Sequence, residues 1–445
     1  HYTRYSYLAF KGDEPENVAK GMWQPLNSPL VRNLSDGELP PLVLPARAPL
    51  AELPAIFDGA AMKRTVGWLA DPRLEGRGLG SDGLDEATNR VEAGFRELGL
   101  QPVGEDGYKQ KWTWTGGDPE REMTLINLVG QLPGADAALA RLPVVVLAHL
   151  DHLGLGWPDV RAGNTGKVHP GADDNASGVA VLLELAAAMA GEPPRPRPVV
   201  FAVVTGEEAG RIGSRHLMTA MTSDRSPFAC VNLDSVGRLG DGKLYVLNAD
   251  SAREWRFIFM GVGYTTGAPV EVVAEPLDSS DQMSCIEVGV PAVQLFAGPH
   301  ADYHRPSDTI DAIDGAGMAV VAEAAHEAVG YLAERTEPMT VTISGIAAGQ
   351  TAHGSESTRR ASLGTMPDFS FPGPGVKVQQ VMPGSAAETA GILAGDVVVA
   401  LDGQTVGDLR GYSGLLKARS PGDEITVTVV REGVEKTLNA TLGER

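Results

Sequence analysis

The chain has 445 residues, 43% of them hydrophobic, and a formal net charge of -20. This length permits about three domains of ordinary size, and the hydrophobic content is enough to build a substantial core. The acidic balance excludes the basic footprint that binding to nucleic acid or to anionic membranes needs, and no apolar run approaches membrane-spanning length.

Residues 1–60 carry no recognisable motif. The first ten residues, HYTRYSYLAF, have alternating aromatic side chains as a strand would, and residues 40–57 are proline-rich and predicted to be extended. The chain opens on His1 without a signal-peptide pattern, so we interpret it as a processed product, a shortened chain or a fragment. Residues 1–60 are then an extension packed on the next domain, or the tail of a longer precursor.

From residue 60 to residue 99 the pattern is helical. Val91, Phe95 and Leu98 recur at amphipathic spacing before a glycine stop. Strands and helices then alternate as far as an alanine-rich helix over residues 317–334. This alternation predicts an α/β domain with a mostly parallel mixed sheet covered by helices.

Five short segments of this domain carry carboxylate or imidazole groups, and most of them close an apolar run that is typical of a buried strand. In an open α/β sheet, ligands gather beyond the carboxyl ends of the strands, so we expect these side chains to lie together. One segment, residues 171–178, instead precedes a predicted helix with Ser177 near its N-cap and Gly191 just past its end. In chain order, the segments carry His149 and Asp151, Asp173 and Asp174, Glu207 and Glu208, Asp234, and His304.

Two imidazoles and several carboxylates are ligands that suit Zn²⁺, whereas an all-oxygen set would favour Mg²⁺ or Ca²⁺. Three ligating carboxylates and a bridging hydroxide carry a charge that balances two divalent cations rather than one. One further carboxylate then remains to act as a general base.

The motifs HLD (149–151), GADDNASG (171–178), GEEAG (206–210), NLD (232–234) and YHRPSDT (303–309) resemble the signature of the co-catalytic di-zinc aminopeptidases. That family also includes glutamate carboxypeptidase, glutaminyl cyclase and the transferrin receptor ectodomain. The resemblance covers roughly residues 65–335. It implies a three-layer zinc-exopeptidase fold, two Zn²⁺ ions, peptide substrates and a periplasmic or secreted location.

The resemblance also implies a role for each residue. Asp174 would bridge both ions, and its peptide bond to Asn175 would be cis. One ion would bind His149 and Asp234, and the other would bind Glu208 and His304. Glu207 would be the catalytic base, and Asp151 would be the acceptor that holds the His149 ring.

Other polar residues have weaker support. Asp308 would either cap the following helix or orient His304, and Gln282 and Cys285 stand where many relatives have histidine and an aromatic residue, which puts the substrate pocket in question. Cys230 and Cys285 permit one disulfide, but two buried thiols are favoured because Cys230 lies in an apolar strand run. We predict that the remaining histidines of this region are structural: His152, His216, His300 and His326.

A composition shift separates the C-terminal part of the chain. We place the first domain at residues 61–336, a linker at 337–362 and a second domain at 363–445. Residues 383–403, PGSAAETAGILAGDVVVALDG, resemble the core of a PDZ domain of the kind attached to bacterial proteases.

PDZ domains bind an extended chain by β-augmentation, and the expected carboxylate loop is residues 364–371. Pro367 removes a donor from this loop, and Asp368 would repel a terminal carboxylate. Binding of a peptide or protein ligand and a purely structural, lid-like or docking role therefore both stay open.

The sequence thus predicts an exopeptidase that hydrolyses the N-terminal peptide bond through a water bridging two zinc ions. The alternatives are a carboxypeptidase or other reaction on the same fold, such as cyclisation of N-terminal glutamine, and a non-catalytic peptide-binding protein. A free amine needs acidic partners, whereas a terminal carboxylate needs arginine or lysine. The surroundings of the motifs are mostly acidic, with Arg211, Arg238 and Arg305 as exceptions, so the aminopeptidase is favoured.

Overall fold

The computed structural model describes residues 56–160, 163–224, 226–274, 277, 280–343, 361–368, 371 and 373–444. The predictions for residues 1–55 and for residues 344–360 of the linker lie outside this part of the chain. Among the described helices, none combines the length and the apolar character needed to cross a membrane.

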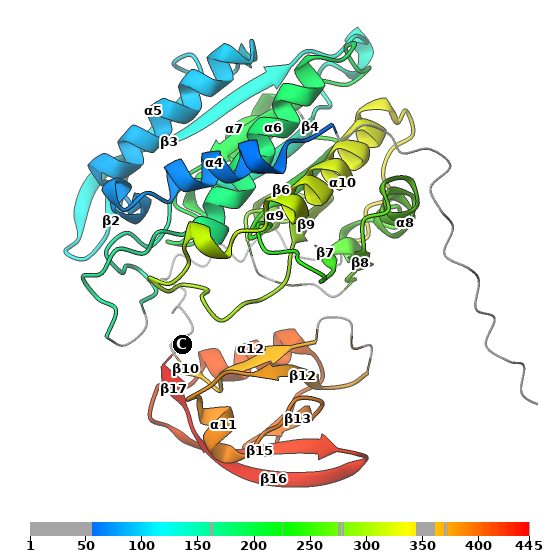
Figure 1. Ribbon diagram of the computed structural model, residues 1–445. Helices are drawn as coiled ribbons and strands as arrows, with labels where there is room; N and C mark the ends of the chain where they lie inside the picture. Colours follow the sequence, from blue (N-terminus) through cyan, green and yellow to red (C-terminus); the bar gives the residue numbers. More distant parts are fainter. Residues whose placement is uncertain are drawn as a thin grey trace, which may run out of the picture. The chain divides into compact units, whose positions relative to one another are not determined.

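The larger domain, described from residue 56 to residue 343, is built on a nine-stranded mixed sheet (Figure 1). Its strand order is β1-β3-β5-β4-β6-β9-β7-β8, with β2 paired to β3. The central strands β5, β4, β6 and β9 are parallel, as is the pair β7 and β8, while the other pairings are antiparallel. The strands are β1 (Gln101–Pro102), β2 (Lys109–Gly116), β3 (Arg121–Leu132), β4 (Val144–His149), β5 (Val199–Val204), β6 (Ala229–Leu233), β7 (Leu244–Leu247), β8 (Val270–Val272) and β9 (Ala292–Phe296).

Helices cover both faces of this sheet, which confirms the predicted three-layer α/β class. Helices α4, α6 and α10 pack on one another over one face, and α7 and α9 contribute to the core of the other face (Figure 1). The helices are α4 (Gly59–Leu69), α5 (Asp82–Glu97), α6 (Gly178–Ala190), α7 (Ile212–Asp224), α8 (Trp255–Thr266), α9 (Gln282–Glu287) and α10 (Gly315–Glu334).

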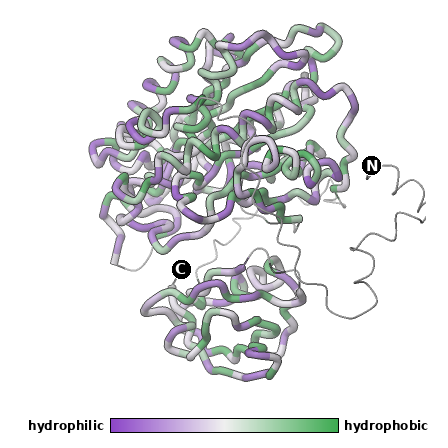
Figure 2. The backbone as a smooth tube through the Cα atoms, turned by 45° about the vertical axis from the view of Figure 1, so that its right-hand side comes forward, coloured by the Kyte–Doolittle hydropathy of each residue, from purple (hydrophilic) through white to green (hydrophobic). Residues whose placement is uncertain are grey.

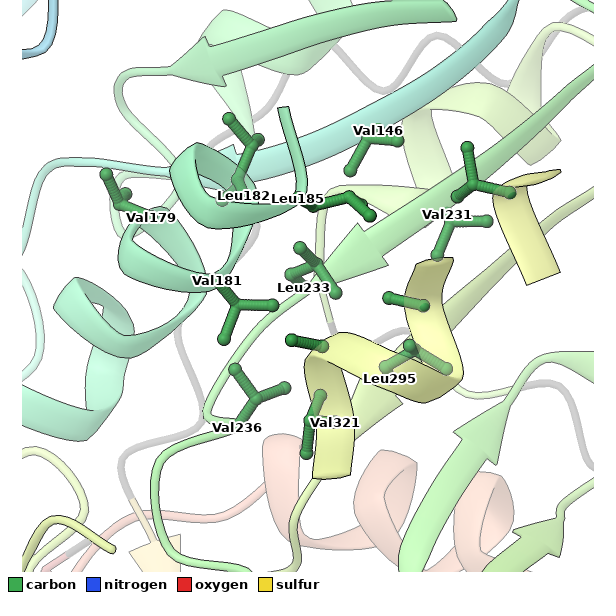
Figure 3. Packing of buried hydrophobic residues seen from close by; sticks show 14 of the residues in the cluster. Val146, Val179, Val181, Leu182, Leu185, Val231, Leu233, Val236, Leu295 and Val321 are labelled. Atoms are coloured by element: carbon green, nitrogen blue, oxygen red, sulfur yellow. The ribbon is translucent and has the colours of Figure 1, made fainter. Parts of the chain in front are cut away.

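Strand β4 shows why its sequence is a continuous apolar run. Val144 and Val146 enter one core, whereas Val145 and Leu147 enter the other, because successive side chains of a strand point to opposite faces. Figure 3 shows Val146, Val231, Leu233 and Leu295 of the central strands among side chains of α6 and α10. The apolar segments lie towards the middle of this domain in Figure 2. This packing fixes the central strands side by side, so their carboxyl ends meet at one edge.

The two cysteines form a disulfide, so the expectation of two buried thiols is wrong. Cys230 lies in β6 and Cys285 in α9, and both are fully buried. The apolar residues around Cys230 did not predict the disulfide, because the pairing depends on where α9 packs against β6.

Residues 339–343, which begin the predicted linker, are attached to the larger domain. The Thr340 carbonyl accepts a hydrogen bond from Arg253 N at 3.1 Å, and Thr342 N donates to Ser251 O at 3.1 Å. Met339 is buried, and Ile343 packs against the core that contains α7 and α9. These contacts extend the larger domain at least as far as Ile343, beyond the predicted end at residue 336.

The C-terminal domain has its own hydrophobic core and a separate antiparallel sheet. Strands β11, β12, β13, β15 and β16 lie in that order, and β14 pairs with β13. The predicted order of short helix, glycine turn and strand is present, because α11 ends on Gly391 at a φ of 79° before β13. The elements are β10 (Ala361–Ser362), β11 (Thr365–Pro367), β12 (Val376–Val381), α11 (Ala386–Ala390), β13 (Val397–Leu401), β14 (Gln404–Thr405), α12 (Leu409–Lys417), β15 (Glu424–Arg431), β16 (Val434–Thr441) and β17 (Gly443–Glu444).

Candidate metal centre

Three neighbouring parallel strands end beside one another and supply most of the candidate residues. His149 is the last residue of β4, Asp234 follows β6, and Glu207 and Glu208 follow β5. Asp174 comes from the irregular turn of residues 172–177 that precedes α6, and His304 from the loop after β9. The structure therefore brings together all the segments that the sequence singled out.

A first group of ligand atoms surrounds the His149 ring. Its Nε2 lies 3.3 Å from Asp174 Oδ1 and 3.6 Å from Asp234 Oδ1. All three side chains are buried, and their ligand atoms lie within 4.8 Å of one another. One imidazole and two carboxylates at such spacing could hold a metal ion.

A second group lies on the other side of the Asp174 carboxylate. His304 Nε2 is 3.2 Å from Asp174 Oδ2 and 3.2 Å from Glu208 Oε2. The ligand atoms of His152, Asp174 and Glu208 lie within 4.8 Å of one another, and His152 Nδ1 is 2.6 Å from Glu208 Oε1, so His152 also belongs to this group. Asp174 thus turns one oxygen towards each group, which is the arrangement that a bridging ligand needs.

The donor atoms suit a site for divalent metal. His304 Nε2 is buried without a hydrogen-bond partner, although two carboxylate oxygens lie 3.2 Å away. Buried carboxylates that face one another are costly unless a cation or a donor offsets their charge. Nitrogen and oxygen donors without thiolate suit a zinc site that keeps an open position. The chemistry of the residues therefore agrees with zinc.

Glu207 belongs to neither group of ligand atoms. Burial raises its pKa well above the usual range, and the negative charges of Asp281, Glu208 and Asp234 act in the same direction. The positive charge of His149 opposes this shift. A raised pKa brings a glutamate closer to the range in which it can both accept and return a proton near neutral pH.

Asp151 contacts the His149 ring, as the resemblance implied, but through its backbone carbonyl and not through its carboxylate. The His149 ring contacts the backbone carbonyl of Asp151, with Nδ1 3.1 Å from that oxygen, while the Asp151 carboxylate stays 4.0 Å away. The carboxylate instead accepts hydrogen bonds from Gly206 N at 2.7 Å and from Glu207 N at 3.2 Å. Asp151 is therefore a positioning residue for the turn that carries Glu207 and Glu208.

Asp308 neither caps the next helix nor orients His304, so both alternatives are wrong. Its Oδ2 accepts hydrogen bonds from the backbone N–H groups of Asp173 and Asp174, at 2.9 and 3.1 Å. Its Oδ1 accepts from the Arg238 guanidinium at 2.5 Å. Asp308 thus fixes the turn that presents Asp174, whose peptide bond to Asn175 is cis, as the resemblance implied.

Sequence reasoning missed two residues of this centre. Asp159 faces the His304 ring, with its Oδ2 2.9 Å from Nδ1, and so takes the orienting role that we considered for Asp308. His152, predicted to be structural, contacts Glu208. A second imidazole in the HLDH sequence was the one available signal, whereas Asp159 lies in a loop without a pattern.

His216, His300 and His326 lie outside both groups of ligand atoms. The His216 ring stacks on Trp112 at a centroid distance of 4.3 Å, and His326 Nε2 lies 2.7 Å from Glu192 Oε1. His300 Nε2 is 3.1 Å from Asp173 Oδ2. These contacts agree with the structural roles that we predict for the three residues.

Gln282 does not face an open pocket. It is fully buried, accepts a hydrogen bond from Asn232 Nδ2 at 3.1 Å and donates through Nε2 to Asn248 Oδ1 at 2.9 Å. The neighbouring Asp281 is also fully buried, and burial raises its pKa to about 6. The departure at Gln282 therefore changes an internal amide network beside the centre.

In the C-terminal domain, the segment predicted as the carboxylate loop, residues 364–371, contains the edge strand β11, which pairs with β12 alone among the described strands. Lys377 Nζ lies 2.9 Å from Asp368 Oδ2 and offsets the charge that we expected to repel a carboxylate. Gly364 N already donates to Ser362 Oγ at 3.0 Å, and the Thr365 hydroxyl lies 2.8 Å from the Tyr412 hydroxyl.

Two family models match separate parts of the chain. Residues 127–329 match the model of Peptidase family M28, and residues 349–442 match that of the PDZ domain. A curated protein named probable leucine aminopeptidase, from Trichophyton verrucosum, is 27% identical over 228 residues, which are 48% of this chain and 58% of that protein. The chain spans 16%, 30% and 58% of the length of the first three curated relatives.

Solved structures share the fold of the larger domain. A glutaminyl cyclase from Fimbriiglobus ruber has a TM-score of 0.53 and 21% identity, over 66% of this chain and 99% of that chain. BSAP, a zinc aminopeptidase from Bacillus subtilis, has a TM-score of 0.50 and 17% identity, over 63% of this chain and 96% of that chain. At these identities the similarity concerns the fold alone.

Proposed function

We propose, from the match of residues 127–329 to Peptidase family M28 and of residues 349–442 to the PDZ domain, that this chain is a zinc aminopeptidase. It would remove N-terminal residues from peptides. The observation that carries the proposal is the Asp174 carboxylate, which offers one oxygen to each of two ligand groups.

Five of these residues would bind zinc, and one would transfer a proton. His149 and Asp234 would hold one zinc ion, Glu208 and His304 the other, and Asp174 both. Bound zinc would lower the pKa of a water and polarise the scissile carbonyl. Glu207 would accept a proton from the attacking water and return it to the leaving amine.

The charges near the centre support an aminopeptidase over a carboxypeptidase. Arg211 is 3.2 Å from Glu287, and Arg238 binds both Asp302 and Asp308, so both guanidiniums already have carboxylate partners. Buried carboxylates such as Asp281 remain close to Glu207 and favour a substrate amine. A terminal carboxylate would need the third arginine, Arg305, whose Nε has no hydrogen-bond partner among the described residues.

A screen of substrates tests the proposal. Purified protein should hydrolyse amino-acid p-nitroanilides, lose this activity when a chelator removes zinc, and regain it when zinc returns. N-acetylated p-nitroanilides should be poor substrates, and the release of C-terminal residues from peptides should be slow. Zinc-dependent cyclisation of an N-terminal glutaminyl peptide without hydrolysis of any p-nitroanilide would instead identify a glutaminyl cyclase, and release of C-terminal residues a carboxypeptidase.

We also propose that the PDZ domain holds a peptide or protein chain along the free edge of β11. The ion pair of Lys377 with Asp368 supports this role, because it offsets the charge that would repel a chain terminus. The Cys230–Cys285 disulfide supports a periplasmic or secreted location, since disulfides persist in oxidising compartments.

Truncation after Ile343 should separate the two domains. Because residues 339–343 pack on the larger domain, a chain ending at Ile343 should fold, bind zinc and cleave small aminoacyl substrates at the rate of the full chain. A matched chain ending at Thr336 should melt at a lower temperature, because it loses those contacts. Only the cleavage of longer peptides should slow, since β-augmentation raises the local concentration of a bound chain.

Activity of the two truncated chains is measured with p-nitroanilides and with peptides of increasing length. If the chain ending at Ile343 kept its fold and its zinc but failed on the smallest substrate, part of the active site would have to come from the C-terminal domain.

A further inference from the structure

Arg77 is a fully buried cation behind the metal centre. Its guanidinium makes its hydrogen bonds to backbone carbonyls: Nε donates to Leu150 O at 2.8 Å, and Nη2 donates to Gly171 O at 2.9 Å. Nη1 donates to Pro170 O at 2.8 Å and to Leu69 O at 2.6 Å. One side chain therefore joins the start of the domain to two separate loops.

Both of these loops carry candidate ligands. Leu150 lies between His149 and Asp151, and Gly171 opens the turn that presents Asp174. The carbonyls that Arg77 binds are thus one peptide from His149 and within a few residues of Asp174. A guanidinium presents its donors as a rigid planar fork, so it can fix the distance between two backbones in a way that an ammonium cannot.

The backbone of Gly76 and Arg77 is hydrogen-bonded to the loop that follows β4. Arg77 O accepts a hydrogen bond from His152 N at 3.2 Å, and Gly76 O accepts from Gly154 N at 3.2 Å. Gly76 has a φ of +62°, and a Cβ atom there would lie 2.3 Å from His169 O. The turn before Arg77 therefore seats closely against the loop that follows β4.

The charge of Arg77 also suits this place. Burial lowers its pKa to about 10, while the carboxylates of Asp174, Asp151, Asp308 and Glu208 oppose that shift. The side chain thus remains a cation at neutral pH behind a cluster of negative charges, while its guanidinium donates hydrogen bonds to backbone carbonyls.

We infer that Arg77 is a positioning residue of the metal centre, which holds the His149 loop and the Asp174 turn in register so that Asp174 faces both ligand groups. This inference rests on the proposed function, because it takes these residues to bind zinc. The competing explanation is that Arg77 only stabilises the fold.

The test compares Arg77→Lys with Arg197→Lys in the full chain. Arg197 is a matched control, because it is also buried and donates to backbone carbonyls, those of Arg335 and Leu142, but contacts none of the loops of the centre. Zinc affinity is measured by competition with a chelator, folding by the melting temperature, and kcat and KM with a small aminoacyl p-nitroanilide.

Arg77→Lys should lower zinc affinity and kcat by about 10- to 100-fold, the usual effect of losing a group that orients ligands, with little change in KM. Arg197→Lys should lower the melting temperature and leave zinc affinity and kcat unchanged. Arg77→Gln, which keeps a planar donor group but not its reach, should behave as Arg77→Lys does.

The inference is wrong if Arg77→Lys keeps wild-type zinc affinity and kcat, or if both lysine variants lose zinc affinity equally. Failure of both Arg77 variants to fold while Arg197→Lys folds would assign Arg77 to stability alone. A wild-type chain that does not bind zinc would overturn the proposed function and this inference with it, whereas tight zinc binding that is indifferent to Arg77 would overturn the inference alone.

Discussion

Replacing Glu207 with glutamine should lower turnover by about two to four orders of magnitude, the usual contribution of general acid-base catalysis, while zinc content stays near that of the wild type. The reason is geometric, since Glu207 belongs to neither group of ligand atoms but lies in the same buried cluster of charges. Glutamine keeps the shape of the side chain and removes its ability to accept a proton. Steady-state kinetics with a p-nitroanilide and elemental analysis of the same sample give both quantities.

Glu287→Gln is the matched control for this variant. Glu287 lies in α9 and pairs with Arg211 and Arg215, so it tests the loss of a paired glutamate outside both ligand groups. It should leave turnover unchanged. If Glu207→Gln lost zinc, and Glu208→Gln kept it, the ligand and the base would be exchanged relative to our assignment.

Replacing Asp174 with alanine should remove metal from both positions and abolish activity. Its two oxygens lie 3.3 Å from His149 Nε2 and 3.2 Å from His304 Nε2, so a single substitution takes a ligand from each group. His304→Ala removes a ligand from the second group only and should mainly weaken one ion. Zinc per chain, measured by elemental analysis after dialysis, should therefore fall further in Asp174→Ala than in His304→Ala.

Asp396→Ala provides the comparison for a buried carboxylate elsewhere. Asp396 is 1% exposed, pairs with Arg431 within the C-terminal domain and has no contact with the candidate ligands, so its loss should leave both ions in place. A single zinc ion per fully active wild-type chain would overturn the two-ion assignment.

Much of the site could be predicted from the sequence because its determinants are local. The run of β-branched residues before His149 specifies a buried strand, and a strand end places a polar residue at the edge of the sheet. The same reasoning holds for Asp234 after β6 and for Glu207 and Glu208 after β5. The residue types then suit zinc, and their order carries the resemblance to the di-zinc aminopeptidases.

The contacts that hold these residues in place could not be predicted, because they join segments far apart in the chain. The Asp151 carboxylate reaches the turn after β5 while its carbonyl serves His149, and only the path of the loop decides which group does which. Asp308 binds backbone groups more than 130 residues away, at Asp173 and Asp174. Asp159 has no pattern to mark it.

The sequence by itself therefore determined the two domains, the layered α/β class and the identity of the candidate ligands. Apolar periodicity and the polar residues at strand ends both depend only on residues that are close together in the chain. Only the tertiary structure decided that Cys230 bonds Cys285, that His152 joins Glu208 and that Arg77 ties two ligand loops together. Each of these contacts depends on how separate elements pack. The hydrophobic pattern of one segment does not show which residue of a distant segment it will contact.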